Sequence, residues 1–208
     1  MHVNTYPLGE LQTNCYVFED MGSCLIIDPG DSADFITEQI QRSNLQVEGI
    51  IVTHGHCDHV LAAEELRINY GVSIFCSSAD QFLLTRASQT ADHFSDSPHP
   101  HMHIKKTVEI MTGKMSLGHF SFSVLATPCH TPGSICIYFK KYQILFTGDT
   151  LFYHAIGSVD HSYSDKTDLQ HSIDTIFHLP EDTIIYPGHG MSSTVGEEKR
   201  QSRYRGYF

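Results

Sequence analysis

The stretch Gly49–His59, GIIVTHGHCDH, joins a continuous apolar run to a loop crowded with metal-ligand side chains. The run Val47–Thr53 is typical of a strand that is buried on both faces. Three imidazoles and one carboxylate then follow within six residues, and so many polar groups cannot lie in an apolar core without partners. Imidazole and carboxylate without thiolate suit zinc, iron or manganese at a catalytic site better than they suit structural zinc. The stretch therefore predicts a catalytic metal centre at the end of a strand.

Four ligands in one loop do not complete two metal sites. Alternate residues of an extended or turning loop point to opposite sides, so we expect His54 and His56 to share one ion while Asp58 and His59 face another. Further candidates lie in Gly- or Pro-rich loops after or between apolar strands: His130 in TPCHTPGS, Asp149 in FTGDT and His189 in YPGHG. Each is an ordinary loop residue when taken alone, but together with Gly49–His59 they predict a larger ligand set.

Strand-like and helix-like segments alternate along the chain, which is the pattern of an α/β fold. In the first half, strands are predicted at Cys15–Glu19, Cys24–Asp28 and Val47–Thr53, with a helix that Ser32 caps and whose inward face is Ala33, Ile36 and Ile40. In the second half, strands are predicted at Ser134–Phe139, Gln143–Thr147 and Thr183–Tyr186, with a helix at Asp168–His178. Each half runs strand, strand, helix, strand and ends in a histidine-bearing loop. We interpret this as an internal two-fold repeat with the site between the halves.

The composition favours a single domain over residues 1–208 and argues against several classes of partner. A net charge of −11 disfavours nucleic acid, because phosphate binding needs a basic surface. No apolar run approaches the roughly 18 residues of a membrane-spanning helix, and the start lacks the basic and apolar regions of a signal peptide. Six cysteines without an export signal indicate reduced thiols in the cytoplasm.

Residues 85–107 break this alternation, with many polar residues, two prolines and four histidines. A connection of this length is either functional or mobile. The histidines do not predict a third metal site, because ligands need fixed outer partners that a Ser- and Pro-rich loop seldom provides. We interpret the segment as a lid over the active site.

The spacing HxHxDH, followed by a single His, an Asp after Gly and a last His after Gly, resembles the metallo-β-lactamase superfamily over nearly the whole chain. The strings GELQTNCYVF, CLIIDPG, GDTLF, PGHG and GEE are similar to its small glyoxalase II-like hydrolases. The resemblance implies a four-layer αββα sandwich of two mixed sheets. It also implies two divalent metal ions, zinc above iron or manganese. The implied ligands are His54, His56 and His130 for the first ion, Asp58, His59 and His189 for the second, and Asp149 as the bridge between them.

The same resemblance implies hydrolysis of hydroxyacyl-glutathione or a related anionic thioester by a hydroxide that bridges the two metals. Asp58 is then a ligand that also orients the water or accepts its proton. A thioester suits such a site because thiolate is a good leaving group. The alternatives are a persulfide dioxygenase with one iron, or a lactonase, β-lactamase or other hydrolase on the same scaffold. A nuclease is disfavoured by the net charge of −11.

The chain departs from the family pattern beside the ligands. Gly157-Ser158-Val159-Asp160 replaces the usual GRTD, Pro128-Cys129-His130 replaces PGH, and Leu61-Ala62 replaces a glycine pair, which should narrow the approach to the metals. Cys57 and Cys129 each adjoin a ligand, as extra soft ligands, redox-sensitive thiols or, in the reading we favour, fillers that point away.

The chain also lacks room for the helical domain that glyoxalase II enzymes add to bind glutathione, since only 19 residues follow His189. Its tail, residues 190–208, is instead basic, and Lys199, Arg200, Arg203 and Arg205 carry its charge. We expect this tail to contact an anionic substrate. The predicted substrate contacts are Tyr153, His154, Arg203 and Arg205.

Overall fold

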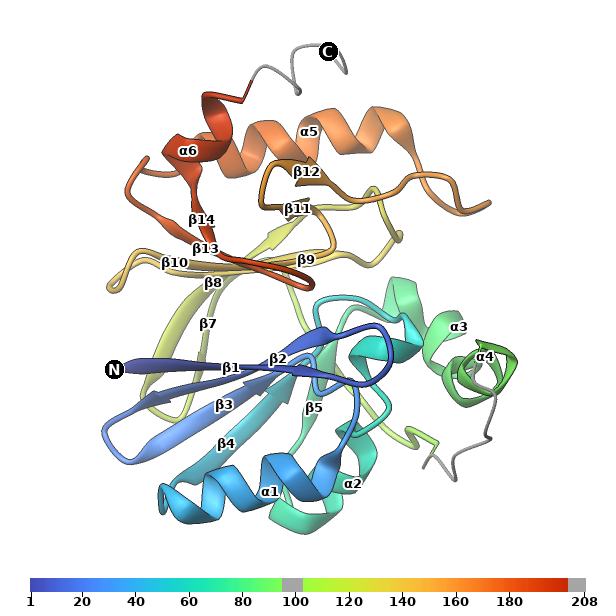
Figure 1. The fold of residues 1–208 in the computed structure, drawn as a ribbon, viewed down its shortest axis with the longest axis vertical. Helices are drawn as coiled ribbons and strands as arrows, with labels where there is room; N and C mark the ends of the chain where they lie inside the picture. The colour runs from blue at the N-terminus through green and yellow to red at the C-terminus, as the bar shows by residue number, and fades with distance from the viewer. Residues whose placement is uncertain (95–102, 202–208) are drawn as a thin grey trace. The chain divides into compact units, whose positions relative to one another are not determined.

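The computed structural model describes residues 1–94 and 103–201 of the chain. It divides into two compact units, unit 1 (Met1–Ile110) and unit 2 (Met111–Phe208). Each unit is built on a six-stranded sheet that mixes parallel and antiparallel strands (Figure 1). The predicted α/β class with two mixed sheets is confirmed.

Unit 1 contains the sheet β1-β2-β3-β4-β5-β6 in chain order. Its strands are β1 (His2–Leu8), β2 (Thr13–Asp20), β3 (Ser23–Ile27), β4 (Gln46–Ile51), β5 (Ile74–Cys76) and β6 (Val108–Glu109). The pairs β1–β2 and β2–β3 are antiparallel, whereas the pairs from β3 to β6 are parallel. Met21 and Gly22 both have positive φ and make the tight turn between β2 and β3, as a two-residue hairpin loop requires.

The helices of unit 1 contribute buried side chains to the same core cluster as the strands of this sheet. They are α1 (Ala33–Arg42), α2 (Ala63–Tyr70), α3 (Gln81–Leu84) and α4 (Ala87–Phe94), with short 3₁₀ turns η1 (Cys57–His59) and η2 (Ser78–Asp80). The inward face predicted for α1 is confirmed, since Ala33, Ile36 and Ile40 are buried in one cluster with the strands. Gly71 ends α2 in the left-handed conformation that glycine adopts most easily.

Unit 2 contains the sheet β14-β13-β10-β9-β8-β7. Its strands are β7 (Gly113–Leu117), β8 (Phe120–Ala126), β9 (Ile135–Phe139), β10 (Ile144–Gly148), β13 (Ile184–Pro187) and β14 (Ser193–Thr194), with a separate hairpin of β11 (Leu151–Phe152) and β12 (Ala155–Ile156). Helix α5 (Lys166–Phe177) packs Leu169, Ile173 and Ile176 into the core, and the short α6 (Val195–Lys199) follows β14.

The internal repeat is visible in the strand pairing of each unit. In unit 1, β1–β2 and β2–β3 are antiparallel, β3–β4 is parallel, and α1 connects β3 to β4. In unit 2, β8–β9 and β9–β10 are antiparallel, β10–β13 is parallel, and α5 lies between β10 and β13 in the chain. These four strands and their helix therefore follow the same order and pairing in both units, and in both the parallel pair ends beside a histidine-bearing loop.

Two local predictions are wrong. Residues 87–94 form helix α4 inside the segment that we expected to be irregular. Ser32 makes no capping hydrogen bond to α1, because its backbone is left-handed (φ 55°) and its hydroxyl is 3.1 Å from Oδ1 of Asp31. Residues 95–102, the middle of the predicted lid, lie outside the described residues, so the lid stays a prediction. In the described part of the chain, every helix is too short or too polar to cross a membrane.

Candidate metal centre

The loop after β4 gathers four of the predicted ligands within unit 1. We call His54, His56, Asp58 and His59 the N-terminal ligand cluster. Nε2 of His54 lies 3.1 Å from Nδ1 of His56, so the two imidazoles turn these nitrogens toward one another. Asp58 and His59 follow on the 3₁₀ turn η1, with Nε2 of His59 3.5 Å from Oδ2 of Asp58. Ligand atoms of His54 and His59 lie within 4.8 Å of each other.

Asp28, at the end of the neighbouring strand β3, fixes this cluster from behind. It is buried, and its Oδ1 accepts from the backbone N–H of Thr53 at 2.7 Å while its Oδ2 accepts from the Thr53 hydroxyl at 2.6 Å. Nδ1 of His59 lies 3.0 Å from the same Oδ2. A carboxylate oxygen can only accept, so Nδ1 carries the proton and Nε2 of His59 is left with a lone pair for a metal. The sequence analysis missed this role of Asp28.

One hydrogen bond and the close packing around two glycines also shape the loop. Oδ2 of the buried Asp80 accepts from the N–H of Gly55 at 2.8 Å. A Cβ on Gly55 would lie 2.8 Å from the Leu83 Cβ, and one on Gly30 would lie 1.7 Å from the carbonyl oxygen of Asp58. Only glycine fits at these positions, so the Asp-Pro-Gly turn after β3 sets the backbone position of Asp58.

Unit 2 gathers the three remaining predicted ligands, which we call the C-terminal ligand cluster: His130, Asp149 and His189. His130 lies between β8 and β9, Asp149 follows β10, and His189 follows β13. Oδ2 of Asp149 is 3.6 Å from Nε2 of His130 and 3.6 Å from Nε2 of His189. One carboxylate oxygen thus lies between two imidazoles, at distances too long for hydrogen bonds.

The loop after β12 holds His130 in place. The carbonyl oxygen of Ser158 lies 2.8 Å from Nδ1 of His130, which fixes the proton on Nδ1 and leaves Nε2 as the ligand atom. The hydroxyl of Ser164 donates to the His130 carbonyl at 2.9 Å. A Cβ on Gly157 would lie 1.8 Å from the Asp149 carbonyl oxygen. Because Ser158 contacts His130 through its main chain, the departure from the GRTD pattern leaves this contact intact.

The donor sets of both clusters fit divalent cations. Two nitrogens that each lie about 2.0–2.1 Å from a tetrahedral zinc ion are roughly 3.4 Å apart, close to the 3.1–3.6 Å separations of these ligand atoms. Imidazole and carboxylate ligands suit zinc, iron and manganese alike. The structure thus supports a divalent metal ion at these residues.

The two cysteines beside the ligands face the cores. Cys129 is buried in the core of unit 2, with its Sγ 3.7 Å from the carbonyl oxygen of Thr127, and Cys57 packs against the core of unit 1. Burial raises the pKa of the Cys129 thiol to about 11 and also raises the pKa of Cys57. Both cysteines therefore act as packing residues, as expected.

Tyr153 and His154, two of the predicted substrate contacts, lie in the turn between β11 and β12. Their rings stack with centroids 3.8 Å apart, and His154 has a left-handed backbone (φ 55°). The backbone N–H of His154 donates to Oε2 of Glu198, and its Nε2 lies 2.9 Å from Nε2 of Gln201. The turn is thereby joined to Glu198 and Gln201 of the tail. Arg203 and Arg205 lie outside the described residues.

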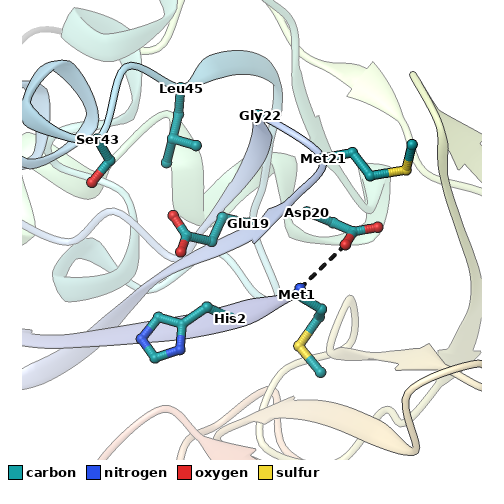
Figure 2. A pocket seen from close by; sticks show the side chains of 8 residues that line it. All are labelled: Met1, His2, Glu19, Asp20, Met21, Gly22, Ser43 and Leu45. Carbon is teal, nitrogen blue, oxygen red and sulfur yellow. Dashed lines mark ion pairs between the residues drawn. The ribbon is translucent and has the colours of Figure 1, made fainter.

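A separate pocket of about 340 Å³ in unit 1 contains none of the predicted ligands (Figure 2). It lies between the start of β1, the β2–β3 turn and the segment after α1, and the amino terminus pairs there with Asp20 at 3.3 Å. The ligand clusters, in contrast, lie at the carboxyl ends of β4, β10 and β13.

Comparison with known proteins gives matches along nearly the whole chain. The family model of the metallo-β-lactamase superfamily matches residues 8–189, a span that includes all seven predicted ligands. Hydroxyacylglutathione hydrolase GloC of Haemophilus influenzae is 35% identical over 98% of both chains. The crystal structure of the BLEG-1 B3 metallo-β-lactamase has a TM-score of 0.89 at 33% identity and covers 97% of this chain and 99% of its own. That of TTHA1623 in a di-iron-bound form has a TM-score of 0.89 at 29% identity, with 97% and 100% covered.

Proposed function

Because the chain belongs to the metallo-β-lactamase superfamily, we propose that it is a binuclear metal-dependent hydrolase of hydroxyacyl-glutathione or a related thioester. The observation that carries the proposal is the complete ligand inventory, with Oδ2 of Asp149 at 3.6 Å from both His130 and His189. A hydrolase of this kind needs a carboxylate that serves two ions at once. The 35% identity to a hydroxyacylglutathione hydrolase over nearly all of both chains supports the thioester substrate.

We assign the ligands in two sets that combine both clusters. His54, His56 and His130 would hold the first ion, Asp58, His59 and His189 would hold the second, and Asp149 would serve both. The imidazole orientations described above support Nε2 as the metal-facing atom of His59 and of His130, because Asp28 and Ser158 fix their protons on Nδ1. We name zinc first and iron or manganese as substitutes, because the donor set accepts all three.

The reaction requires a nucleophile, an electrophilic carbonyl and a leaving group. Bound divalent ions would supply Lewis acidity, which lowers the pKa of water toward about 7 and polarises the acyl carbonyl. Asp58 orients the attacking water and accepts its proton, and its side chain is 19% exposed, so it can reach both solvent and substrate. The thiolate leaves with little acid assistance, so the mechanism needs no further general acid.

Substrate recognition would come from unit 2. We propose that Tyr153 and His154 line the approach and that Arg203 and Arg205 contact the carboxylates of an anionic thioester. The link from His154 to Gln201 supports this, because it places Gln201 of the basic tail at the β11–β12 turn. Replacing Arg203 and Arg205 together by alanine should raise KM for an anionic thioester, and an unchanged KM would exclude the tail from binding.

Elemental analysis combined with a substrate panel tests the proposal. We expect two metal ions per chain and faster turnover of S-lactoylglutathione than of a lactone or a β-lactam. One iron per chain with oxygen consumption on a persulfide would instead make the protein a dioxygenase. The 33% identity to a B3 metallo-β-lactamase makes β-lactam hydrolysis the second candidate, and a preference for β-lactams in the same panel would establish it. We also propose a reducing compartment such as the cytoplasm, because all six cysteines are free.

A further inference from the structure

Asp58 receives a hydrogen bond from a residue outside the predicted ligand set. The hydroxyl of Thr13, at the start of β2, donates to Oδ2 of Asp58 at 2.7 Å. Thr13 is 1% exposed, so water cannot easily replace this acceptor, and the hydroxyl stays directed at the carboxylate. The contact joins two positions that are 45 residues apart in the chain.

The surroundings of Thr13 hold its hydroxyl in a fixed position. Thr13 pairs with Leu8 across the β1–β2 hairpin, and the turn between them is closed by two bonds from Gln12. The backbone N–H and the side-chain amide of Gln12 both donate to the carbonyl oxygen of Gly9, at 3.2 and 2.7 Å. Strand β2 also packs against η1, which carries Asp58.

The other metal-ligand candidates show why such a donor matters. His59 is oriented by Asp28 and His130 by the carbonyl of Ser158, so each imidazole has an outer partner that fixes its ring. Gly30 fixes the backbone of Asp58 but cannot stop rotation of its carboxylate. Thr13 supplies a restraint on the side chain itself, because its hydroxyl holds one carboxylate oxygen of Asp58.

We propose that Thr13 is the positioning residue of Asp58: its hydroxyl orients the carboxylate for metal binding and for its part in hydrolysis. The inference rests on the proposed function for the identity of the site. It adds Thr13 as a residue that sets the affinity for the ion held by Asp58. Thr13 lies on β2, a strand that contributes no candidate ligand.

The test compares metal binding by metal-free full-length variants. Thr13→Val keeps the branched shape and removes the hydroxyl, whereas Thr13→Ser keeps the hydroxyl. Cobalt(II) titrations followed by visible absorption and calorimetry should show an about 10- to 100-fold larger dissociation constant for one ion in Thr13→Val. This is about the loss of affinity typical when an outer partner of a metal ligand is mutated. Thr13→Ser should stay close to wild type. Equal affinities in Thr13→Val and wild type would overturn the inference.

Two controls separate positioning from a general structural effect. Thr183→Val removes another buried hydroxyl, one that has no hydrogen-bond partner among the described residues, and should bind cobalt like wild type. In an Asp58→Ala background, Thr13→Val should cause no further loss of affinity, because its effect passes through Asp58. A further loss in that background would contradict the inference. Should Thr13→Val not fold, Thr13→Ala, which also removes the hydroxyl, carries the same comparison.

The outcomes also distinguish the two proposals. A wild type that binds one ion, or that does not hydrolyse thioesters, contradicts the proposed function. The comparison of Thr13→Val with Thr13→Ser still decides the role of Thr13, because it depends on ion affinity rather than on turnover.

Discussion

Nδ1 of His59 lies 3.0 Å from Oδ2 of Asp28, so a carboxylate at the end of β3 orients a ligand that follows β4. The two strands are parallel neighbours, and their carboxyl ends therefore meet at one edge of the sheet. The same carboxylate accepts two bonds from Thr53, the residue before His54. Asp28 thus connects both ends of the N-terminal ligand cluster.

Asp28→Asn should weaken metal binding about 10- to 100-fold, because the amide nitrogen cannot accept from His59 and Thr53. Asparagine tolerates the left-handed backbone of this position (φ 50°), so the substitution adds little strain. The free energy of unfolding should fall by about 1–3 kcal/mol. Metal content by elemental analysis and urea unfolding measure the two effects. Asp31→Asn, which changes a carboxylate bonded only locally to Ser32, is the control and should retain its metal.

His56→Ala removes one of the two nitrogens that face each other at 3.1 Å in the N-terminal ligand cluster. We expect the purified variant to lose at least one ion per chain and most of its hydrolytic activity, since the remaining ligands cannot complete the first set. Elemental analysis and turnover of S-lactoylglutathione give the readout. Survival of both metal content and activity would show that the ligand assignment is wrong. His119→Ala, at a ring stacked on Phe120 in the turn between β7 and β8, outside the loops that carry the candidate ligands, is the matched control.

Gly157→Ala should damage the C-terminal ligand cluster, because its Cβ would lie 1.8 Å from the Asp149 carbonyl oxygen and 3.5 Å from the His130 Cβ. Backbone must move to relieve such an overlap, at a cost of about 1–3 kcal/mol or more. Urea unfolding should show this loss together with reduced metal content. Gly71→Ala provides the comparison: it has a positive φ of 65° and no neighbour within 4 Å, so it should lose stability without losing metal.

Alkaline pH should destabilise the fold through its buried thiols. Burial raises the pKa of Cys129 to about 11, whereas the unfolded chain has a thiol pKa near 8.5. Well below about pH 8.5 the Cys129 thiol is neutral in both the folded and the unfolded chain, so this group does not make the free energy of unfolding depend on pH. Between about pH 9 and 11 only the unfolded chain releases the proton, so the free energy of unfolding falls by up to about 1.4 kcal/mol per pH unit.

Urea unfolding at a series of pH values measures this slope. Cys129→Ala removes one of these groups and should give a shallower decline than the wild type between pH 9 and 11. The same slope in both proteins would show that Cys129 does not contribute.

The candidate ligands could be proposed from the sequence because their residue types and positions are local signals, and the structure brings them close together within each unit. His54 to His59 follow one strand, and Asp149 and His189 each follow another, so alternation of apolar runs with loops located them all. Asp28 was missed because its role depends on Thr53 and His59, which are 25 and 31 residues away and reach it only through the parallel pairing of β3 and β4. Thr13 was missed because its contact with Asp58 also joins two positions far apart in the chain, here by 45 residues.

Helix α4 shows a different limit of sequence analysis. Its buried positions are Ala87 and Ala91, in register with Leu84, and this spacing is helical. Alanine buries so little apolar surface that the spacing did not stand out among the polar residues. The cap predicted for α1 failed because a serine caps only from an extended backbone, and the left-handed φ of Ser32 could not be foreseen from its identity.

The buried sulfurs have a practical consequence for enzymology. Burial raises the pKa of all six cysteines, to about 12 for Cys24 and Cys136 and about 11 for Cys76 and Cys129. Protonated sulfur is a poor nucleophile, so we expect these thiols to react slowly with a chromogenic disulfide reagent at neutral pH. Glutathione set free from a substrate would react with that reagent at once, and turnover can be followed continuously in one mixture.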